Sequence, residues 1–535
     1  MQSKVNFNLN FKKDISSILF FILFWIGLLI FTGNIPSHYH FIDDHQIITL
    51  NKQLNNSGVI SVAIKSVKDD HLFRLRPLFS VHYVFLTKLF GMNITAWSVY
   101  FAILGVLTSF FLFKFLSILN FTFIQSILFS LLTLTGVQSV IWYQFADAEN
   151  LGMFFLSLSL LFLAKSIYSG KYILFYKIFF ILSLLLSALC KESFILMIPA
   201  VLFLYLWQYS KKKSLTILKS VKDNLAVTVI PLLAVISLLF IIVFFIGIDK
   251  TGQTGVDNKI MSLKFLREFF YTLRYSTYFL IILFGIFILI DFKISGSEKI
   301  LSKDFFLKIV NEFLSITILF FLIIIPQFTL YYKSGMRDRY FLPFIIGFSF
   351  FIIFLIKKIY DSNSISVFVK YLFLSLTIII LLFEIRNNTI PYMRKYADDS
   401  ISSDKMLNSI ILNTKKESVI TAVMDPVQNF EQAKSLMIYL KNIAGIKNIN
   451  FNFTKRDYIT DSFSDSSFYN LSEVYTKKYF VNSLFDSVKN KNNIECVVLF
   501  PKLENNFLKQ NTNWFNKNDF RREEFDFYTI YYKNN

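Results

Sequence analysis

The sequence predicts an α-helical polytopic membrane protein with a small C-terminal α/β domain. The 535 residues are 54% hydrophobic and only 17% charged, and their mean hydropathy is +0.52. The apolar residues gather in long runs without charge, whereas residues 385–535 hold 38 charged residues in 151 positions. This composition excludes a soluble enzyme, a disordered chain and a repeat solenoid. Two cysteines, Cys190 and Cys496, allow at most one disulfide.

The apolar runs predict about eleven membrane spans. Each span needs about 20 mostly apolar residues to cross ~30 Å of hydrocarbon. The first run follows two lysines and an aspartate, and it resembles the apolar part of a signal peptide. Because no small-residue cleavage site is obvious, we interpret it as a retained anchor. The predicted spans are 15–31, 97–118, 121–143, 149–167, 172–190, 193–209, 225–248, 275–292, 310–331, 340–358 and 366–384.

The lysine and arginine distribution predicts the orientation. With the N-terminus in the cytoplasm, the inner segments of residues 1–384 hold 19 Lys/Arg and 7 Asp/Glu, and the outer segments hold 15 and 12. This excess follows the positive-inside rule, and an odd number of spans places the C-terminus outside. We therefore expect a multi-pass protein of the plasma (inner) membrane. The net charge of +19 then reflects lysines at the cytoplasmic surface rather than a nucleic-acid partner.

The charged C-terminal part predicts a second domain. Residues 1–384 would form the membrane domain, with a first outer loop at 36–96, and residues 385–535 an extracytoplasmic α/β domain that selects the acceptor. We expect two buried strands at Val419–Val423 and Cys496–Phe500, an amphipathic helix at Phe430–Leu440, and a further strand at Phe525–Tyr532.

All five histidines lie between residues 38 and 82, in the predicted first outer loop. The loop begins with His38-Tyr-His40 and continues with Asp43-Asp44-His45. A carboxylate in a membrane-edge pocket can act as a general base, and an ordinary pair of turn residues is the alternative. The same side chains are ligand types for zinc or manganese. Their spacing fits no closed zinc pattern, so histidines that merely face water are the alternative.

Two further outer loops place charge at the predicted membrane edge. Asp147 and Glu149 lie between the third and fourth spans, and Lys191-Glu192 between the fifth and sixth. Charge at this depth is costly unless it is paired or solvated. We therefore expect these side chains to bind or orient a substrate or a cation. A solvated hairpin and an internal salt bridge are the alternatives.

Four arginines also fall on the predicted outer side, where the positive-inside rule does not explain them. Arg74 and Arg76 precede a proline that should end or start a helix, and Arg337 and Arg339 lie at the start of the tenth span. Guanidinium groups suit bidentate phosphate binding. The alternatives are contact with anionic lipid headgroups and pairing with Asp338.

These elements, in this order and on one side of the membrane, resemble the GT-C superfamily of membrane glycosyltransferases. That superfamily includes protein O-mannosyltransferases and lipid A aminoarabinose transferases, which take a sugar from a polyprenyl-phosphate carrier. The resemblance covers roughly residues 10–360. It rests on Asp43-Asp44, Arg76-Pro77-Leu78, Asp147 with Glu149, Lys191-Glu192 and Arg339-Tyr340.

The resemblance implies an enzyme of the cell envelope that transfers a sugar with inversion. Asp43 or Asp44 would be the general base that deprotonates an acceptor hydroxyl of a lipid, glycan or protein. Other residues would bind the leaving donor phosphate, orient the acceptor or a metal, or hold a divalent metal ion if one is used. The residues for the donor phosphate are Arg74, Arg76, Lys191, Arg337, Arg339 and Tyr340. Those that would orient the acceptor or a metal are Asp147, Glu149 and Glu192, and those that would hold a metal ion are His45, Asp44 and Asp147.

No nucleotide cofactor is expected, because the sequence has no P-loop and no G-x-G-x-x-G at a strand–helix junction. The resemblance fixes neither the sugar nor the acceptor. A transporter or flippase is one alternative, but such proteins place ionisable groups near the bilayer midplane. A polysaccharide polymerase or ligase, and a non-catalytic assembly protein, are the others.

Overall fold

The computed structural model describes residues 11–71, 74–246, 303–330, 338–362, 365–454, 466–484 and 494–534. The chain divides into two compact units, and each is assembled from three separate stretches. Unit 1 comprises Met1–Phe31, Ala63–Tyr83 and Val99–Met393. Unit 2 comprises Thr32–Val62, Val84–Ser98 and Arg394–Asn535.

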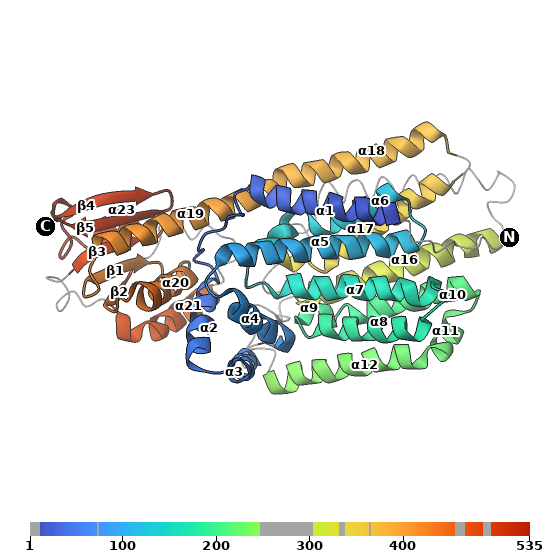
Figure 1. Cartoon of the computed structure of the whole chain (residues 1–535), viewed down its shortest axis with the longest axis horizontal. Helices are drawn as coiled ribbons and strands as arrows, with labels where there is room; N and C mark the ends of the chain where they lie inside the picture. The colour runs from blue at the N-terminus through green and yellow to red at the C-terminus, as the bar shows by residue number, and fades with distance from the viewer. Residues whose placement is uncertain are drawn as a thin grey trace. The chain divides into compact units, whose positions relative to one another are not determined.

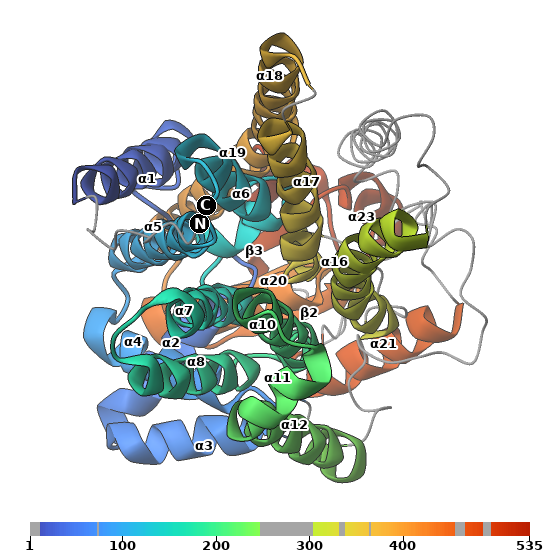
Figure 2. The same ribbon diagram turned by 90° about the vertical axis from the view of Figure 1, so that its right-hand side faces the viewer.

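Helices of unit 1 lie along one another as a bundle (Figure 1). In Figure 2, which views them nearly end-on, α7, α8 and α10 lie side by side. The helical elements up to residue 246 are α1 (Phe11–Phe31), α2 (His45–Asn56), α3 (Val59–His71), α4 (Pro77–Phe90), α5 (Ile94–Ile118), α6 (Phe123–Leu134), η1 (Val137–Trp142), α7 (Ala148–Tyr168), α8 (Ile173–Ala188), α9 (Glu192–Ile195), α10 (Ile198–Lys213), α11 (Ile217–Asp223), α12 (Leu225–Phe240) and η2 (Ile241–Ile246). The later ones before the sheet are α16 (Lys303–Leu330), η4 (Asp338–Phe341), α17 (Phe344–Asp361), α18 (Val367–Glu384), η5 (Ile385–Thr389) and α19 (Ile390–Asn413).

Six helical segments in the described part of the chain are long and apolar enough to cross a membrane. They are Lys12–Phe31, Ile94–Ile118, Ala148–Tyr168, Glu192–Lys213, Leu225–Ile246 and Val367–Asn413. Each contains or closely matches a predicted span, which confirms a helical polytopic membrane protein. The predicted spans 172–190 and 310–331 correspond to shorter apolar helices, and 340–358 to α17. The predicted span 275–292 lies outside the described residues, so the total of eleven stays a prediction.

The prediction of one continuous helix over 121–143 is wrong. Helix α6 ends at Leu134, and Gly136 follows with a φ of +97°, a conformation that interrupts an α-helix and that glycine adopts readily. A Cβ at this position would lie 2.9 Å from Oε1 of Gln138. The chain then continues as the 3-10 turn η1, whose six residues are all buried. Irregular backbone is tolerated in such a protein when other protein atoms cover it, and here it leads directly to Asp147.

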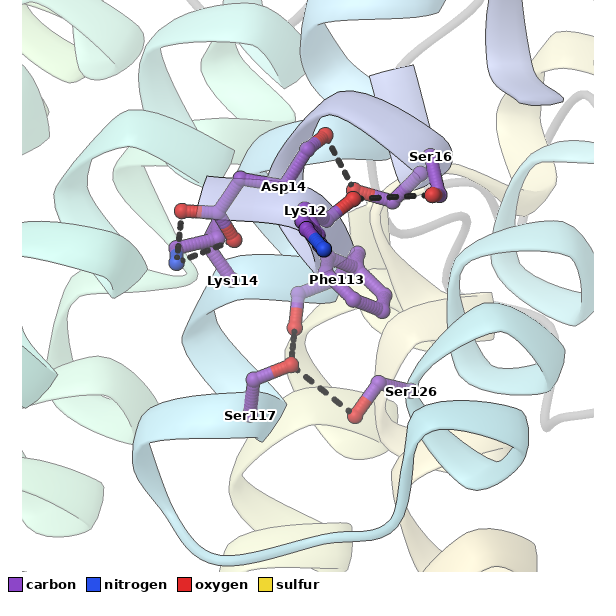
Figure 3. Close-up of polar contacts among 8 residues, drawn as sticks. Lys12, Asp14, Ser16, Phe113, Lys114, Ser117 and Ser126 are labelled. Atoms are coloured by element: carbon purple, nitrogen blue, oxygen red, sulfur yellow. Dashed lines mark hydrogen bonds and ion pairs between the residues drawn. The ribbon is translucent and has the colours of Figure 1, made fainter. Parts of the chain in front are cut away.

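A partly buried ion pair joins the start of α1 to the end of α5 (Figure 3). The Lys114 ammonium donates to both carboxylate oxygens of Asp14, at 2.7 and 2.8 Å. Near the same end of α5, Ser117 donates to the carbonyl of Phe113 and lies 3.4 Å from the Ser126 hydroxyl of α6. The pair therefore brings together the first residues of one predicted span and the last turns of the next, as expected for antiparallel neighbours.

Unit 2 contains a five-stranded mixed sheet in the order β2-β1-β3-β5-β4. β1 pairs in parallel with β2 and β3, and β5 runs antiparallel to β3 and β4. Strand β1, which lies between β2 and β3, is buried along almost its whole length. The elements are β1 (Val419–Met424), α20 (Phe430–Tyr439), η6 (Leu440–Ala444), β2 (Ile449–Phe453), α21 (Ser466–Tyr479), η7 (Val481–Ser483), β3 (Ile494–Leu499), α23 (Glu504–Gln510), η8 (Lys517–Asp519), β4 (Phe520–Phe525) and β5 (Tyr528–Lys533).

The α/β domain is thus confirmed, with one correction. The two predicted buried strands are β1 and β3, and the predicted amphipathic helix is α20. The strand predicted at Phe525–Tyr532 is wrong in its start, because Phe525 ends β4 and the chain reverses before Tyr528 begins β5. Asp526 occupies this turn with a positive φ of 21°. Turn geometry of this kind divides an apparently continuous aromatic run into a hairpin.

Residues that directly follow α1 belong to the core of unit 2. Tyr39 and Phe41 are 4% and 1% exposed and pack in the same hydrophobic cluster as the sheet. The Tyr39 hydroxyl lies 2.7 Å from that of Ser435 in α20, and the Phe41 ring meets the Tyr528 ring edge-on at 5.6 Å. Burial of two aromatic side chains anchors this segment, and it fixes the position of the acidic pair that follows.

Candidate functional site

The structure groups the predicted site residues into two sets, one in each unit. The set in unit 1 centres on two buried carboxylates at the start of α7. Asp147 is the N-cap residue and Glu149 lies in the first turn, where the helix dipole favours negative charge. Their side chains are 0% and 2% exposed. Buried carboxylates of this kind need partners, because an unpaired buried charge is strongly unfavourable.

Two cations from distant parts of the sequence supply the positive charge that balances these carboxylates. Lys191, directly before α9, forms an ion pair with Glu149. Arg339, in η4, forms one with Asp147, and its Nε lies 3.9 Å from Oε1 of Glu149. Both cations also lie over the Tyr340 ring, at 4.8 and 5.5 Å from its centroid, where cation–π attraction adds to the pairing. We call Asp147, Glu149, Lys191, Arg339 and Tyr340 the charge cluster.

The sequence produces this geometry through the interruption of α6. η1 packs against η4, so the turn that precedes Asp147 lies against the turn that carries Arg339. Lys191 reaches the cluster because α7 and α8 form a tight antiparallel hairpin. That hairpin is held by close packing: Ser187 donates to the carbonyl of Gly152 at 2.8 Å, and Gly152 leaves no room for a Cβ beside the buried ring of Phe194.

The Arg-Pro-Leu segment before α4 is attached to the same region. The backbone N–H of Leu75 donates to Oε1 of Glu192 at 3.1 Å, so Glu192 holds this segment in place. Arg76 donates two hydrogen bonds to Asp70, at 2.6 and 3.3 Å. Burial alone would lower its pKa, but Asp70, with Glu192 and Glu149 behind it, raises the pKa of Arg76. Arg74 lies close enough for its charge to act on Lys191.

The set in unit 2 lies in the segment between α1 and α2. The carboxylate of Asp44 accepts the backbone N–H of His40 at 2.8 Å, and Nδ1 of His40 accepts the N–H of Ile42 at 3.0 Å. Asp44 is 0% exposed, whereas Asp43 is partly exposed. Asp43 has a φ of +68°, a conformation that is uncommon for a residue other than glycine and that often marks functional sites.

Burial sets the protonation of this acidic turn. It raises the pKa of Asp44 well above its usual value, and the neighbouring charge of Asp43 raises it further. Burial also lowers the pKa of His40 to about 4 and that of His45 to about 3. Both imidazoles are therefore neutral at pH 7, and burial shifts the equilibrium of Asp44 toward its protonated form. The side chain of Gln46 donates to Asp43 at 3.3 Å, and the charge of Asp43 acts on Lys434 of α20.

The predicted metal ligands Asp44, His45 and Asp147 are divided between the two units. Across the described ranges, no three His, Cys, Asp or Glu side chains come together in an arrangement that could hold a metal ion. Asp44 and His45 lie in unit 2, and Asp147 lies in unit 1. The divalent metal ion therefore stays a prediction, and no step of the reaction is assigned to one.

The remaining predicted residues are dispersed. Arg337 lies outside the described residues. His71 ends α3, and Nε2 of His82 in α4 lies 2.7 Å from the Tyr100 hydroxyl. His38 pairs with Asp404 of α19 at 3.2 Å. His38 and His82 thus pair with different residues.

Sequence reasoning missed two contacts that affect these assignments. Asp70 was not expected to bind Arg76, although an aspartate six residues before an arginine at a helix–proline junction could have suggested it. Lys434 of α20 was not expected near Asp43, and nothing in the sequence relates positions so far apart.

Comparison with known proteins gave structural likenesses alone. No family model and no curated protein matches the chain. The crystal structure of ArnT from Cupriavidus metallidurans bound to undecaprenyl phosphate matches with a TM-score of 0.47 and 11% identity, over 96% of this chain and 97% of that one. The apo form of ArnT matches with a TM-score of 0.43 and 12% identity, over 95% and 97%. These likenesses assign neither a family nor an activity to the chain.

Proposed function

We propose that the protein is a membrane glycosyltransferase that moves a sugar from a polyprenyl-phosphate donor to an acceptor hydroxyl. The charge cluster is the observation that carries this proposal. Ionisable groups at the ends of membrane spans are costly and usually functional. Here two cations and two carboxylates lie where α7 and α9 begin, and the sequence motifs that contribute them are those of the GT-C resemblance.

The charge cluster suits a leaving phosphate held at the edge of the membrane. Lys191 and Arg339 would stabilise the negative charge that grows on the phosphate as the sugar departs. The carboxylates would keep these two cations in place before the donor arrives, which is the preorganisation that such stabilisation requires. Arg339 is 25% exposed, whereas its partner Asp147 is fully buried, so the guanidinium is the more accessible member of the pair.

Asp43 is the better candidate for the general base. It is partly exposed and has a strained backbone conformation, as expected for a residue presented to a substrate. Asp44 instead is buried and accepts the backbone N–H of His40, and its burial raises its pKa. In the proposed reaction Asp43 takes the proton of the acceptor hydroxyl, whose oxygen bonds to the anomeric carbon. The bond from that carbon to the phosphate oxygen breaks, its electron pair stays with the polyprenyl phosphate, and the sugar inverts.

The proposal includes an orientation: the N-terminus is cytoplasmic, and the charge cluster and unit 2 face outward from the plasma (inner) membrane. The excess of Lys and Arg in the predicted inner segments supports it. Labelling of single cysteines introduced into β4 and into the loop between α10 and α11, which lies within the lysine-rich segment 211–222, from one side of intact cells, tests this orientation. Labelling of the loop from outside the cell would contradict it.

The test of the activity uses two isosteric variants of the acidic turn, expressed in the native host. Asp43→Asn should lower the rate of sugar transfer by about 10²–10⁴, the usual contribution of a general base. Asp44→Asn should keep activity within about tenfold of the wild type, because an amide resembles a protonated carboxyl group that accepts one hydrogen bond. The readout is the loss of a sugar mass from envelope lipids and glycans by mass spectrometry, at equal membrane expression.

The two variants also serve as controls for each other. Loss of the sugar in Asp44→Asn but not in Asp43→Asn would assign the base to Asp44. If both variants leave every envelope glycan unchanged, the acidic turn is not catalytic and the glycosyltransferase proposal fails.

A further inference from the structure

Unit 2 contains an open cleft of about 370 Å³, a volume within the range of about 300–1,000 Å³ that small-molecule sites occupy. Its walls come from three parts of the sequence that all belong to unit 2: the segment before α2, the turn before α5, and the helices α19 and α20 with η6. None of the residues in the proposed reaction lines it. The cleft is therefore a separate candidate site.

One wall carries a polar pair. Nδ1 of His38 lies 3.2 Å from Oδ2 of Asp404, and the two side chains are 38% and 32% exposed. A carboxylate oriented by an imidazole, and still open to solvent, can accept hydrogen bonds from a ligand. Asn93 and Thr95 also line the cleft. The Oδ1 atom of Asn93 accepts the N–H of Ala96, which leaves its amide nitrogen as the donor.

The lining of the cleft includes two aromatic side chains, Tyr39 and Tyr439. The rings of Tyr39 and Tyr439 pack with their centroids 4.9 Å apart. The hydroxyl of Tyr39 is engaged by Ser435 at 2.7 Å, so this side chain is fixed. Tyr439 is partly exposed, and the charge of Asp404 acts on it. An aromatic side chain with one polar end provides both an apolar face and a hydrogen-bonding group.

The charge of the cleft disfavours anionic ligands. The ten residues that line it include no lysine and no arginine, and they do include the Asp404 carboxylate. Phosphate recognition requires cationic or backbone N–H donors, so an anion is disfavoured here. A carboxylate, an imidazole, an amide and two tyrosine rings instead suit a neutral ligand with many hydroxyl groups and an apolar ring face.

We propose that this cleft binds a carbohydrate, as the acceptor-recognition site of unit 2. The proposal rests on the proposed sugar transfer, and it narrows the acceptor class to glycans. The vicinal hydroxyls of a sugar ring would donate to Asp404 and accept from Asn93, while the C–H face of the ring would pack on Tyr439. Recognition of the acceptor here would be separate from the activation of its hydroxyl by Asp43.

The test is saturation-transfer NMR on the full chain in lipid nanodiscs, since sugar-headgroup detergents would compete. The probes are cellobiose, lactose, chitobiose and mannobiose, each alone, and inorganic phosphate followed by its ³¹P signal. At least one disaccharide should receive saturation from the wild type. Asp404→Asn should weaken its binding by about tenfold, the loss expected for a hydrogen bond to a charged group. Tyr439→Ala should also weaken it, because this variant removes the ring face on which the sugar packs. Asp398→Asn, an exposed carboxylate of the same helix, should bind as the wild type does.

Thr95→Phe provides a second test that removes no polar anchor, because it fills the cleft. Loss of the disaccharide signal in this variant supports the proposal even if Tyr439→Ala does not fold. The proposal is overturned if no disaccharide binds to the wild type, if binding survives in the variants that fold, or if phosphate binds and Asp404→Asn abolishes that binding.

These measurements do not involve sugar transfer. A wild type that transfers a sugar but gives no disaccharide signal refutes the cleft alone. Unchanged envelope glycans in Asp43→Asn and Asp44→Asn refute the proposed function, whatever the NMR experiment gives.

Discussion

Three glycine-to-alanine substitutions test the packing that positions Lys191. A Cβ built on Gly152 would lie 2.7 Å from Cδ2 and 2.9 Å from Cζ of Phe194, and it would contact Cε2 as well. Carbon atoms normally approach to about 3.5–4.0 Å, so the ring would have to move by about 1 Å. Phe194 is 1% exposed, and it lies three residues after Lys191 in the same turn. The substitution therefore forces a buried ring, and the segment that carries it, away from α7.

The expected cost follows from two opposing effects. Overpacking of a buried site costs about 1–3 kcal/mol, and replacement of glycine by alanine inside a helix returns at most about 1 kcal/mol. Gly152→Ala should therefore destabilise the protein by about 1–2 kcal/mol. Gly27→Ala is the matched control, because nothing lies within 4 Å of its Cβ, and it should be neutral or stabilising by up to about 1 kcal/mol. Gly347→Ala should fall between them, since its closest contact, at 2.8 Å, is the terminal carbon of Ile323.

The assay measures unfolding of the purified protein in detergent. Titration with a denaturing detergent gives the free energies of unfolding, and thermal scanning gives the rank order of stability. Sugar transfer is measured on the same samples. Gly152→Ala should also lower transfer, because the displaced turn carries Lys191 out of register with Glu149. A Gly152→Ala protein as stable and active as Gly27→Ala would refute the described packing of α7 against α9.

Two further predictions concern charge. Glu149→Gln should cost about 3–5 kcal/mol of stability, because it leaves the Lys191 ammonium buried without its carboxylate, and the double variant with Lys191→Met should recover most of that loss in the same unfolding titration. A loss in the double variant equal to the sum of the losses in the two single variants would show that the two residues are not coupled. In the unfolded chain, His40 becomes protonated near pH 6.5. In the folded protein its pKa is about 4, so it becomes protonated only near pH 4. Because the unfolded state binds this proton first, His40 lowers the free energy of unfolding by about 3 kcal/mol as the pH falls from 7 to 4. The loss of stability between pH 7 and pH 4 should therefore be about 3 kcal/mol smaller in His40→Gln than in the wild type. Asp44 contributes with the opposite sign, and equally in both proteins. An identical loss in the two proteins would contradict a buried neutral imidazole at His40.

Secondary structure was predictable wherever apolar pattern alone decides it. Long runs without charge must be helical in a membrane, because each backbone polar group needs a partner inside the chain. The central strands of unit 2 were predictable because both faces of β1 are buried, which leaves a continuous apolar run. The interruption of α6 was not, because Gly136 lies in a run that is still apolar, and its positive φ depends on the packing of Gln138 and on a hydrogen bond from its N–H to Thr389.

The candidate site was predictable as a list of residues but not as an arrangement. Membrane-edge charges stand out in an apolar sequence, and this identified Asp147, Glu149, Lys191 and Arg339. Which carboxylate binds which cation depends on the approach of η1 to η4 and of α7 to α8. Likewise, Asp43 and Asp44 are equivalent in the sequence, and only the fold of the turn buries one and presents the other.

The sequence by itself therefore determined that this is a membrane protein, what type of secondary structure it forms and which of its charged residues are unusual. These properties follow from hydropathy and from the cost of isolated charge in an apolar medium. The tertiary structure decided which charges are paired, which aspartate is accessible, and that Tyr39 and Phe41 join the core of the α/β unit. These properties depend on contacts between residues that are hundreds of positions apart, as between Arg339 and Asp147 or between Tyr39 and Ser435. Local pattern carries no information about such contacts, since they arise only when the packed surfaces of separate elements meet.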